Sequence, residues 1–314
     1  VIIKFLNESG NEDTKLLTEQ GILKGEVPLT AVQKWFFDNE FKAADYWNQS
    51  FVVKTPNLEI DRFREAVSKL IEHHDGFRLR YKKSKSQATL SSRYIQYYDA
   101  EAMAEEPRIL DIRCLKHQEG SQEFALELEE ILTGWQSSFN IEHGPLYSVG
   151  YIYGYGDGSG RVWFALHHLI ADGISCRIIT QDLQDCYNKK NLGLKGSSYR
   201  QWVGALEKYA NSNEEEKDYW TNIISDYNNQ SKSSVFENEG ASYAELCLTE
   251  EKTSLLLKES NKAYNTEVND ILLTALGYTL KEITNNEVNY IVLEGHGREE
   301  IEDKIDISRT LGWF

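Results

Sequence analysis

The sequence has little of several features that mark special classes of protein. It contains four prolines, and no run approaches the roughly 18 apolar residues of a membrane-spanning helix. The first residues, VIIKFLNESGNEDTK, lack the basic flank and long apolar centre of a secretory signal. We therefore expect a cytosolic protein.

Cysteine is also scarce. The four cysteines are Cys114, Cys176, Cys186 and Cys247. They are widely separated and none has CxxC spacing, so neither a zinc site nor a disulfide framework is indicated. Cys176 follows a histidine-rich segment, but it lies in an apolar series with Ile174 and Ile178, which favours packing over nucleophilic chemistry.

Basic residues are outnumbered, with 34 Lys and Arg against 50 Asp and Glu and a formal net charge of -16. This balance opposes nucleic-acid binding, which needs cations to neutralise phosphates. A composition of 40% hydrophobic and 27% charged residues is typical of a globular protein. A length of 314 residues favours two lobes with a cleft between them.

The pattern of the chain predicts a linker over residues 1–25, an N-terminal lobe over 26–190 and a C-terminal lobe over 191–314. Helices and strands alternate in the first lobe. Helices are expected over 27–40 (beginning near Thr30), 58–74, 121–136 and 173–188, and strands over 47–54, 77–81, 145–156 and 162–168.

The second lobe is expected to start near Ser197 with three helical stretches. One of them contains the charge run 213–224, which is interpreted as a solvated face. Strands are predicted over 244–249 and 288–294, with helices over 250–262 and 267–282 between them. The whole pattern indicates an α/β or α+β fold.

The segment VWFALHHLIADG (162–173) is the first candidate site. An apolar strand that ends in His167 and His168 places imidazoles at the edge of a hydrophobic layer. Because adjacent strand residues point to opposite faces, one histidine can face a cavity while the other braces the structure. Asp172 can cap the next helix or accept from a buried arginine, and Gly173 turns the chain.

A histidine pair alone is a weak signal, since most histidines do no chemistry. The second pair, His73 and His74, ends an amphipathic helix and is interpreted as interacting with its dipole.

The segment EGHGREE (294–300) is the second candidate. Glu294 ends a predicted strand beside two glycines that permit a bend or close ligand approach, which suits a catalytic base. The GHG pattern lacks both the GxGxxG spacing and the lysine of a phosphate-binding loop, so nucleotide binding is rejected.

Together these segments resemble a known family. HHLIADGIS resembles the HHxxxDG signature of the condensation-domain superfamily of nonribosomal peptide synthetases, and the chain looks like its epimerization domains. The supporting segments occur in the family's order: PLTAVQKWFF (28–37), WNQS (47–50), NDILLTALG (269–277), EGHGREE (294–300) and SRTLGWF (308–314). The resemblance implies a two-lobed chloramphenicol-acetyltransferase-like fold with an active-site tunnel between the lobes.

The implied reaction inverts the α-carbon of an aminoacyl or peptidyl thioester held on the phosphopantetheine arm of an upstream peptidyl carrier domain. The resemblance assigns the catalytic roles to His168 and Glu294 and leaves open which of them removes the L-side proton. It implies no bound cofactor beyond the carrier's arm and no metal, and it implies other synthetase modules as partners.

The resemblance also assigns supporting roles. His167 is expected to be structural, Asp172 to pair with Arg78, and Gly173 to make the turn. His296 and Arg298 are expected to orient Glu294 or contact the phosphate of the arm.

Two departures from the family's pattern stand out. Asp45 and Tyr46 precede WNQS where members commonly carry histidines, and the chain ends at Phe314 inside a motif that the family continues into the rest of the second lobe. We therefore expect a second lobe that is incomplete in this sequence.

Three alternatives stay open. They are a condensation domain that forms a peptide bond, an inactive fragment that docks a carrier, and an acyltransferase that uses coenzyme A.

Overall fold

The computed structural model describes residues 16–84, 93–230, 244–263 and 265–314. It divides the chain into two compact units: unit 1 comprises residues up to Ser212 together with His296–Phe314, and unit 2 comprises Asn213–Gly295. The predicted lobe boundary between residues 190 and 191 differs from this division. The helix after Ser197 and the C-terminal segment both pack with the N-terminal residues.

Unit 1 contains two sheets. The smaller has the order β1 (Gly25–Val27), β4 (Tyr94–Tyr98), β3 (Leu79–Lys83), and the larger has the order β2 (Asn48–Pro56), β7 (Ser159–His167), β6 (Tyr147–Tyr153), β5 (Arg108–Asp111). All neighbours are antiparallel except β5 and β6. The sequence analysis missed the short strands β1, β4 and β5.

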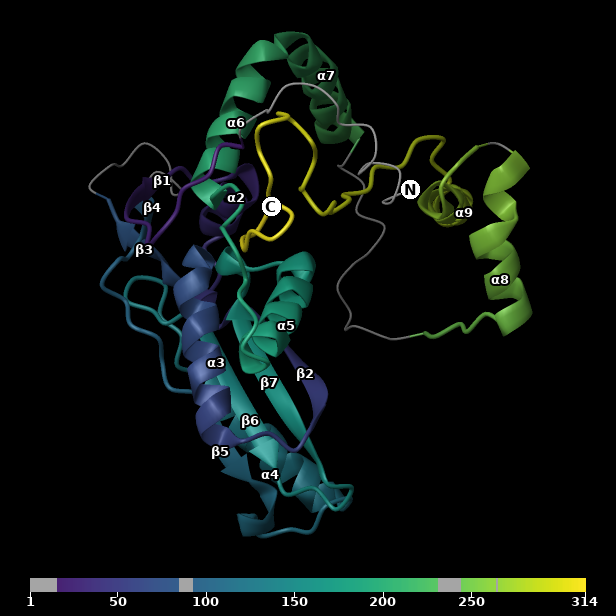
Figure 1. The fold of residues 1–314 in the computed structure, drawn as a ribbon. Coiled ribbons are helices and arrows are strands. Elements are labelled where there is room, and N and C mark those ends of the chain that lie inside the picture. Colours follow the sequence, from purple (N-terminus) through teal and green to yellow (C-terminus); the bar gives the residue numbers. More distant parts are fainter. Residues whose placement is uncertain (1–15, 85–92, 231–243, 264) are drawn as a thin grey trace. The chain divides into compact units, whose positions relative to one another are not determined.

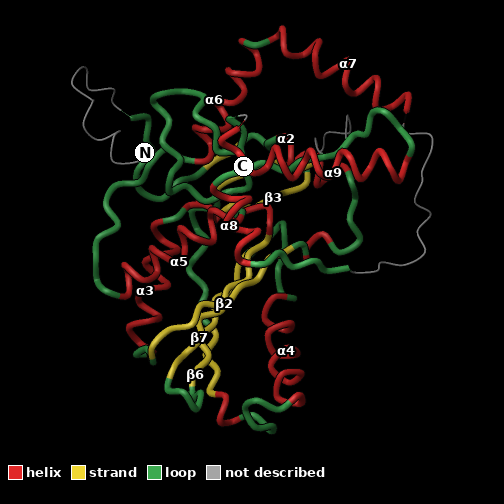
Figure 2. Tube along the Cα trace, turned by 90° about the vertical axis from the view of Figure 1, so that its right-hand side faces the viewer, coloured by secondary structure: helices red, strands yellow, loops and turns green. Residues whose placement is uncertain are grey.

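Helices cover both faces of the larger sheet. In Figure 2, α3 (Ile60–His73) and α5 (Gly173–Tyr187) lie on one side of β2, β7 and β6, and α4 (Gln122–Gln136) lies on the other. Figure 1 shows α3 and α5 side by side over these strands. This covering explains why the sequence of β7 is almost continuously apolar, because a strand buried on both faces loses the usual alternation.

The core of unit 1 joins these layers. Its fully buried side chains come from α3, β7 and α5 alike and include Phe63, Leu70, Phe164, Leu166 and Ile179. Two further helices lie in this unit, α2 (Ala31–Asp38) and α6 (Tyr199–Ser212). As predicted, α2 begins after Thr30, whose hydroxyl accepts from the Gln33 backbone while the Gln33 side chain accepts from the Thr30 backbone.

The described part of the predicted linker packs on unit 1. The Leu17 backbone N–H donates to the Lys304 carbonyl at 2.8 Å, Glu19 forms an ion pair with Arg200 at 2.5 Å, and Leu23 is buried. Residues 1–15 of that prediction lie outside the described residues. The connection of this segment to an upstream domain stays a prediction, and the residues after 15 have polar and apolar partners in unit 1.

Unit 2 contains α7 (Glu214–Gln230), α8 (Glu250–Lys258) and α9 (Val268–Thr284). The predicted strands over 244–249 and 288–294 are wrong: neither segment is a strand, and Leu246 and Val292 are 88% and 98% exposed. A strand needs the hydrogen bonds of a neighbour, and within the described residues neither segment pairs with one. No described residue of unit 2 belongs to the buried core.

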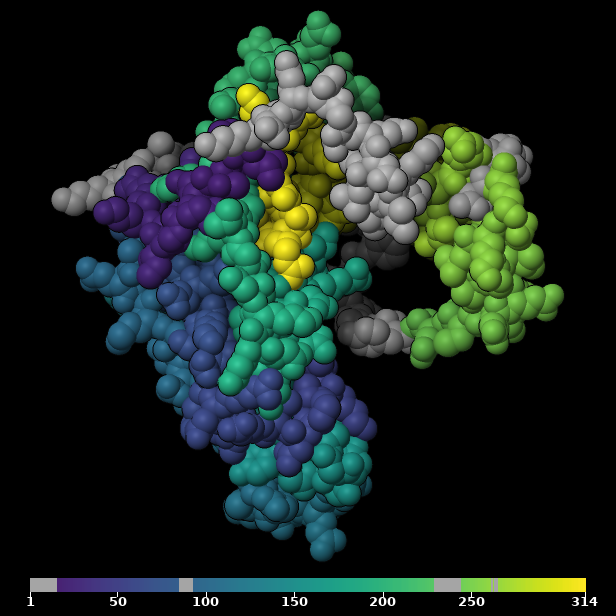
Figure 3. All heavy atoms as spheres, viewed as in Figure 1, coloured from purple at the N-terminus to yellow at the C-terminus, as the bar shows by residue number. Residues whose placement is uncertain are grey.

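The C-terminal segment of unit 1 lies among residues far from it in sequence. Figure 3 shows its yellow atoms between the purple N-terminal part and the teal α5 region. Ser197 and Asp306 bind each other through two hydrogen bonds, at 2.7 and 3.0 Å.

Across all described residues, none of the helices is both long and apolar enough to cross a bilayer.

Gly76 lets this segment approach. A Cβ at Gly76 would lie 2.8 Å from the Leu311 Cβ and 3.3 Å from the Leu311 carbonyl oxygen. We expect Gly76→Ala to lower the free energy of unfolding by about 1–3 kcal/mol through overpacking, as measured by urea denaturation. Gly134→Ala is the matched control: a Cβ there meets nothing within 4 Å, so this change in α4 should stabilise by about 0.4–1 kcal/mol. Equal effects of the two substitutions would contradict the contact.

Candidate active site

The end of β7 places the two histidines of the first candidate segment. His167 pairs with Asn48 in the antiparallel register of β2 and β7, and its side chain is fully buried. Its Nε2–H donates to the Ala44 carbonyl at 2.8 Å, and its Nδ1 accepts from the Leu169 backbone N–H at 3.1 Å. The Phe36 ring meets it edge-on at 5.8 Å. Both ring nitrogens are therefore used within the core.

His168 lies one residue further on, where a short 3-10 turn begins, and is half-buried. Its backbone N–H donates to the Trp47 carbonyl at 2.9 Å. Its Nδ1 lies 3.0 Å from the Ala171 carbonyl oxygen, which can only accept, so Nδ1 carries the hydrogen. This leaves Nε2 as the nitrogen with the lone pair, the form that a general base requires.

Asp172 is held by Arg298. Arg298 Nη2 lies 3.1 and 3.2 Å from the two Asp172 carboxylate oxygens, and its Nε lies 3.3 Å from Oδ2. Asp172 also caps α5, accepting from the Ser175 backbone N–H at 2.6 Å. The side chains of Arg298 and Asp172 are only 7% and 13% exposed, so this is a buried, bidentate ion pair.

The predicted pair of Asp172 with Arg78 is wrong. Arg78 instead forms an ion pair with Asp75 and donates to the Ile71 carbonyl at 2.6 Å and the Glu72 carbonyl at 3.3 Å. It therefore closes the end of α3. The sequence pattern pointed to Arg78, and the fold shows that Arg298 is the arginine that reaches Asp172.

Arg298 does more than neutralise Asp172. Its Nη1 donates to the Ile307 carbonyl at 3.0 Å and to the Thr310 carbonyl at 2.8 Å, and the Phe314 ring covers its guanidinium at 3.8 Å. These contacts occupy the guanidinium. Arg298 holds chain segments together instead of facing the phosphate of an arm, which corrects the sequence-based prediction.

The other predicted residues are placed as follows. Gly173 is the first residue of α5, outside the left-handed region, and a Cβ there would meet nothing within 4 Å, so the turn is made by the preceding residues. The exposed His296 accepts from the Arg298 backbone N–H at 3.0 Å through Nδ1. Glu294 is exposed and belongs to unit 2, so its approach to His168 stays a prediction.

A polar cluster stands at the end of α3. The buried Asp182 of α5 accepts from His74 Nε2 at 2.8 Å and forms an ion pair with Arg309. Burial opposes ionisation of Asp182, but these two hydrogen bonds hold its pKa below the usual value. His74 is thus a partner of a carboxylate, where the sequence analysis expected an interaction with the helix dipole.

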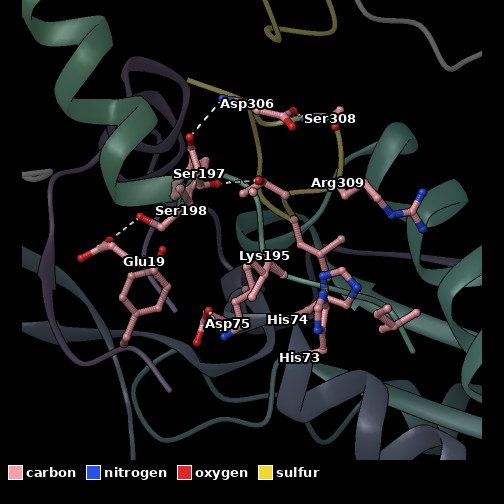
Figure 4. Close-up of a pocket in the computed structure, with 18 residues that line it drawn as sticks. Glu19, His73, His74, Asp75, Lys195, Ser197, Ser198, Asp306, Ser308 and Arg309 are labelled. Atoms are coloured by element: carbon pink, nitrogen blue, oxygen red, sulfur yellow. Dashed lines mark hydrogen bonds and ion pairs between the residues drawn. The ribbon is translucent and has the colours of Figure 1, made fainter. Parts of the chain in front are cut away.

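His74 and Arg309 of this cluster are among the residues that line a cavity of about 120 Å³, shown in Figure 4. Lys195 reaches into it and binds Asp75 at 2.7 Å. Burial and the neighbouring charge of His74 lower the pKa of His73 to about 4. Through Asp182, His74 and Arg309 tie the end of α3, α5 and the C-terminal segment together.

Sequence reasoning missed two residues of the site. Trp313 stacks on the His168 ring, with 4.2 Å between ring centroids and 31° between planes. Ser175 donates through its hydroxyl to the Gly312 carbonyl at 3.2 Å and accepts from Arg298 at 3.1 Å. The segment SRTLGWF was noticed as a motif, but its sequence carries no signal of what Trp313 touches.

The environment of Cys176 favours packing over nucleophilic chemistry. Burial, reinforced by Asp172, raises the pKa of the Cys176 thiol to about 11, so it is a packing residue at neutral pH. Within the described ranges, no group of three or more His, Cys, Asp or Glu side chains could hold a metal ion.

The fold and the geometry of the site together define a class of domain. It is a mixed α/β domain in which a histidine with an available Nε2 follows a buried strand and a buried Arg–Asp pair holds the loop behind it. The sequence matches the Condensation domain family over residues 23–314, and the chain belongs to this family. The fold is the chloramphenicol-acetyltransferase-like fold of condensation-family domains.

Several relatives are synthetases. The chain is 38% identical over 313 residues to N-(5-amino-5-carboxypentanoyl)-L-cysteinyl-D-valine synthase of Amycolatopsis lactamdurans, covering 100% of this chain and 8% of that protein. It is 37% identical over 317 residues to gramicidin S synthase 1 of Brevibacillus brevis, covering 96% of this chain and 28% of that protein. The chain thus spans a small part of these multidomain relatives.

Solved structures agree with this assignment. The epimerization domain from the third module of tyrocidine synthetase B superposes with a TM-score of 0.75 at 31% identity, covering 95% of this chain and 66% of that one. The first condensation domain of the calcium-dependent antibiotic synthetase superposes with a TM-score of 0.65 at 15% identity, covering 91% of this chain and 68% of that one, which shows a shared fold.

The Arg298–Asp172 pair can be tested by double-mutant cycles. We expect Asp172→Ala and Arg298→Ala each to cost about 3–5 kcal/mol of unfolding free energy, because each leaves a buried charge without its partner. The cycle should show a coupling energy of about 1–3 kcal/mol, measured by urea denaturation. The cycle of Asp172→Ala with Arg78→Ala should be additive. Coupling to Arg78 instead of Arg298 would contradict the structure.

The buried His167 predicts a pH dependence of stability. Burial, opposed by the hydrogen bond to Ala44, lowers its pKa to about 4. An unfolded histidine takes up its proton near pH 6.5, so the folded state loses stability as the pH falls from about 6.5 towards 4, by up to about 1.4 kcal/mol per pH unit.

The measurement is the free energy of unfolding between pH 7 and pH 4. His167→Gln should reduce its slope, since the amide can replace both hydrogen bonds without titrating. His143→Gln, at an exposed histidine, is the matched control and should keep the slope because His167 is still present. An unchanged slope in His167→Gln would show that other groups cause the dependence.

Proposed function

We propose that this chain is an epimerization domain that inverts the α-carbon of an aminoacyl or peptidyl thioester on the arm of a carrier protein. The observation that carries the proposal is the similarity to a solved epimerization domain, at 31% identity over 95% of this chain. The condensation domain of the calcium-dependent antibiotic synthetase has the same fold at 15% identity.

Two further observations favour epimerization over peptide-bond formation. The segments EGHGREE (294–300) and SRTLGWF (308–314) resemble epimerization domains in particular. A relative that matches the whole chain is named as the synthase of a peptide that ends in D-valine. An epimerization step is one way in which such a synthase can produce the D-configured residue.

The chemistry needs two proton-transfer groups. The thioester acidifies the α-hydrogen, so one group takes this proton, the electron pair of the C–H bond forms an enolate, and a second group delivers a proton to the opposite face. His168 suits one role because its Nδ1–H is held by the Ala171 carbonyl and its Nε2 accepts. Glu294 is proposed for the other role, and either order of action conserves atoms and charge.

The proposed partners follow from the substrate. The thioester arm is carried by an upstream peptidyl carrier domain, and other modules of a synthetase would supply and consume the peptide, in the cytoplasm. The phosphopantetheine arm of the carrier is part of the substrate, and the proposed reaction uses no resident cofactor. Arg298, Asp172 and Ser175 hold the loop on which His168 stands, so they act through position.

Deuterium exchange tests the proposal directly. The full-length protein is incubated in deuterated water with a carrier protein loaded with an L-valyl thioester, a side chain chosen for the D-valine of the relative. Mass spectrometry of the released amino acid should show α-deuterium, and chiral analysis should show a mixture of D and L forms. His168→Ala and Glu294→Gln should each slow exchange by about 10²-fold or more.

His143→Ala and Glu300→Gln are the matched controls, since they remove a histidine and a carboxylate at exposed positions outside the proposed chemistry. Both should keep wild-type exchange. Peptide-bond formation with a second loaded carrier, without α-exchange, would overturn the proposal in favour of a condensation domain. Retained exchange in one of the two site variants would exclude that residue's role.

A further inference from the structure

Trp313 lies against the reactive histidine in a fixed arrangement. Its indole covers the His168 ring with a centroid distance of 4.2 Å and a tilt of 31°, and its side chain is only 4% exposed. The Phe36 ring meets Trp313 edge-on at 6.3 Å and also meets His167 edge-on at 5.8 Å. The rings of Phe36 and Trp313 therefore form one aromatic cluster that contacts both His167 and His168.

The backbone around Trp313 is fixed as firmly as its ring. The buried Tyr199 hydroxyl of α6 donates to the Trp313 carbonyl at 2.5 Å. The preceding residue, Gly312, exchanges hydrogen bonds with the Ser175 hydroxyl of α5, at 3.2 and 3.3 Å. Two helices thus determine where the indole stands.

Within the part of the chain that the structure describes, a hydrogen bond holds the Nδ1 atom of the His168 ring. The bond from Nδ1 to the Ala171 carbonyl fixes one atom of the ring, but rotation about the Cβ–Cγ bond tilts the plane at little cost, because such torsions are broad. A flat surface at van der Waals distance removes this freedom.

We infer that Trp313 is a positioning residue that fixes the plane and the Nδ1–H tautomer of His168 and so aims Nε2 at the substrate's α-carbon. The statement that Nε2 is aimed at the α-carbon rests on the proposed function. The statement that Trp313 fixes the His168 ring does not depend on that function, because it follows from contacts within unit 1. Trp313 itself exchanges no proton in this scheme.

The test combines a spectroscopic and a kinetic measurement on the full chain. Imidazole nitrogens are labelled with ¹⁵N, and the His168 signals are identified by their absence in His168→Gln. Trp313→Leu should convert a single Nδ1–H tautomer into a mixture, whereas Trp313→Phe keeps a ring at the same place and should preserve it. In the exchange assay, Trp313→Leu should lower kcat by about tenfold or more with KM unchanged, because misaligned reacting groups lose rate without losing binding.

Trp35→Leu removes a tryptophan that is 49% exposed and is the matched control, with unchanged His168 signals and exchange. If Trp313→Leu does not fold, Trp313→Met supplies the non-aromatic variant. Unchanged His168 signals in the non-aromatic variant overturn the inference, whatever its activity. Tautomer mixing in a protein whose wild type shows no α-exchange supports the positioning of the ring and overturns the proposed function.

Discussion

The buried ion pair between Arg298 and Asp172 is the interaction on which the rest of the site depends. It links a loop in the middle of the sequence to a segment near the C-terminus, at hydrogen-bond distances of 3.1–3.3 Å. Arg298 uses its remaining donors on the carbonyls of Ile307 and Thr310, so the same group folds the C-terminal segment back onto α5. A buried pair of this kind adds little net stability, but it specifies one arrangement because either charge alone is costly.

The two histidines at the end of β7, His167 and His168, have different structural roles. The alternation of a strand directs His167 into the core, where both of its nitrogens have backbone partners. The 3-10 turn then leaves His168 with one nitrogen tied to a carbonyl and one ring face against an indole. Because His167 makes the hydrogen bonds that hold the end of β7 in the core, Nε2 of His168 is not needed for this structural role.

The sequence predicts the helices and the longer strands of unit 1, because their signals are local, but it misses the short strands β1, β4 and β5. Thr30 marks the start of α2, and the apolar run before His167 predicts the strand β7. The site was predicted less completely, because its contacts join distant residues. Asp172 was expected to pair with Arg78 but pairs with Arg298, because no pattern in the sequence measures which arginine lies near it.

The failures in unit 2 have a different physical origin. Segments 244–249 and 288–294 have the composition of strands, but a strand exists only beside another strand, and pairing is a property of the fold. The sequence therefore identified residues suited to a sheet without determining whether they join one.

The discontinuity of unit 1 has a consequence for synthesis on the ribosome. Asp172 and Arg298 are 126 positions apart, and at about 5–20 residues per second the arginine is added roughly 6–25 s after the aspartate. The sheet and the helices that cover it are complete well before then. The nascent chain thus carries a largely built scaffold in which Asp172 still lacks its ion pair and His168 still lacks its aromatic neighbour, so these contacts form after the sheet.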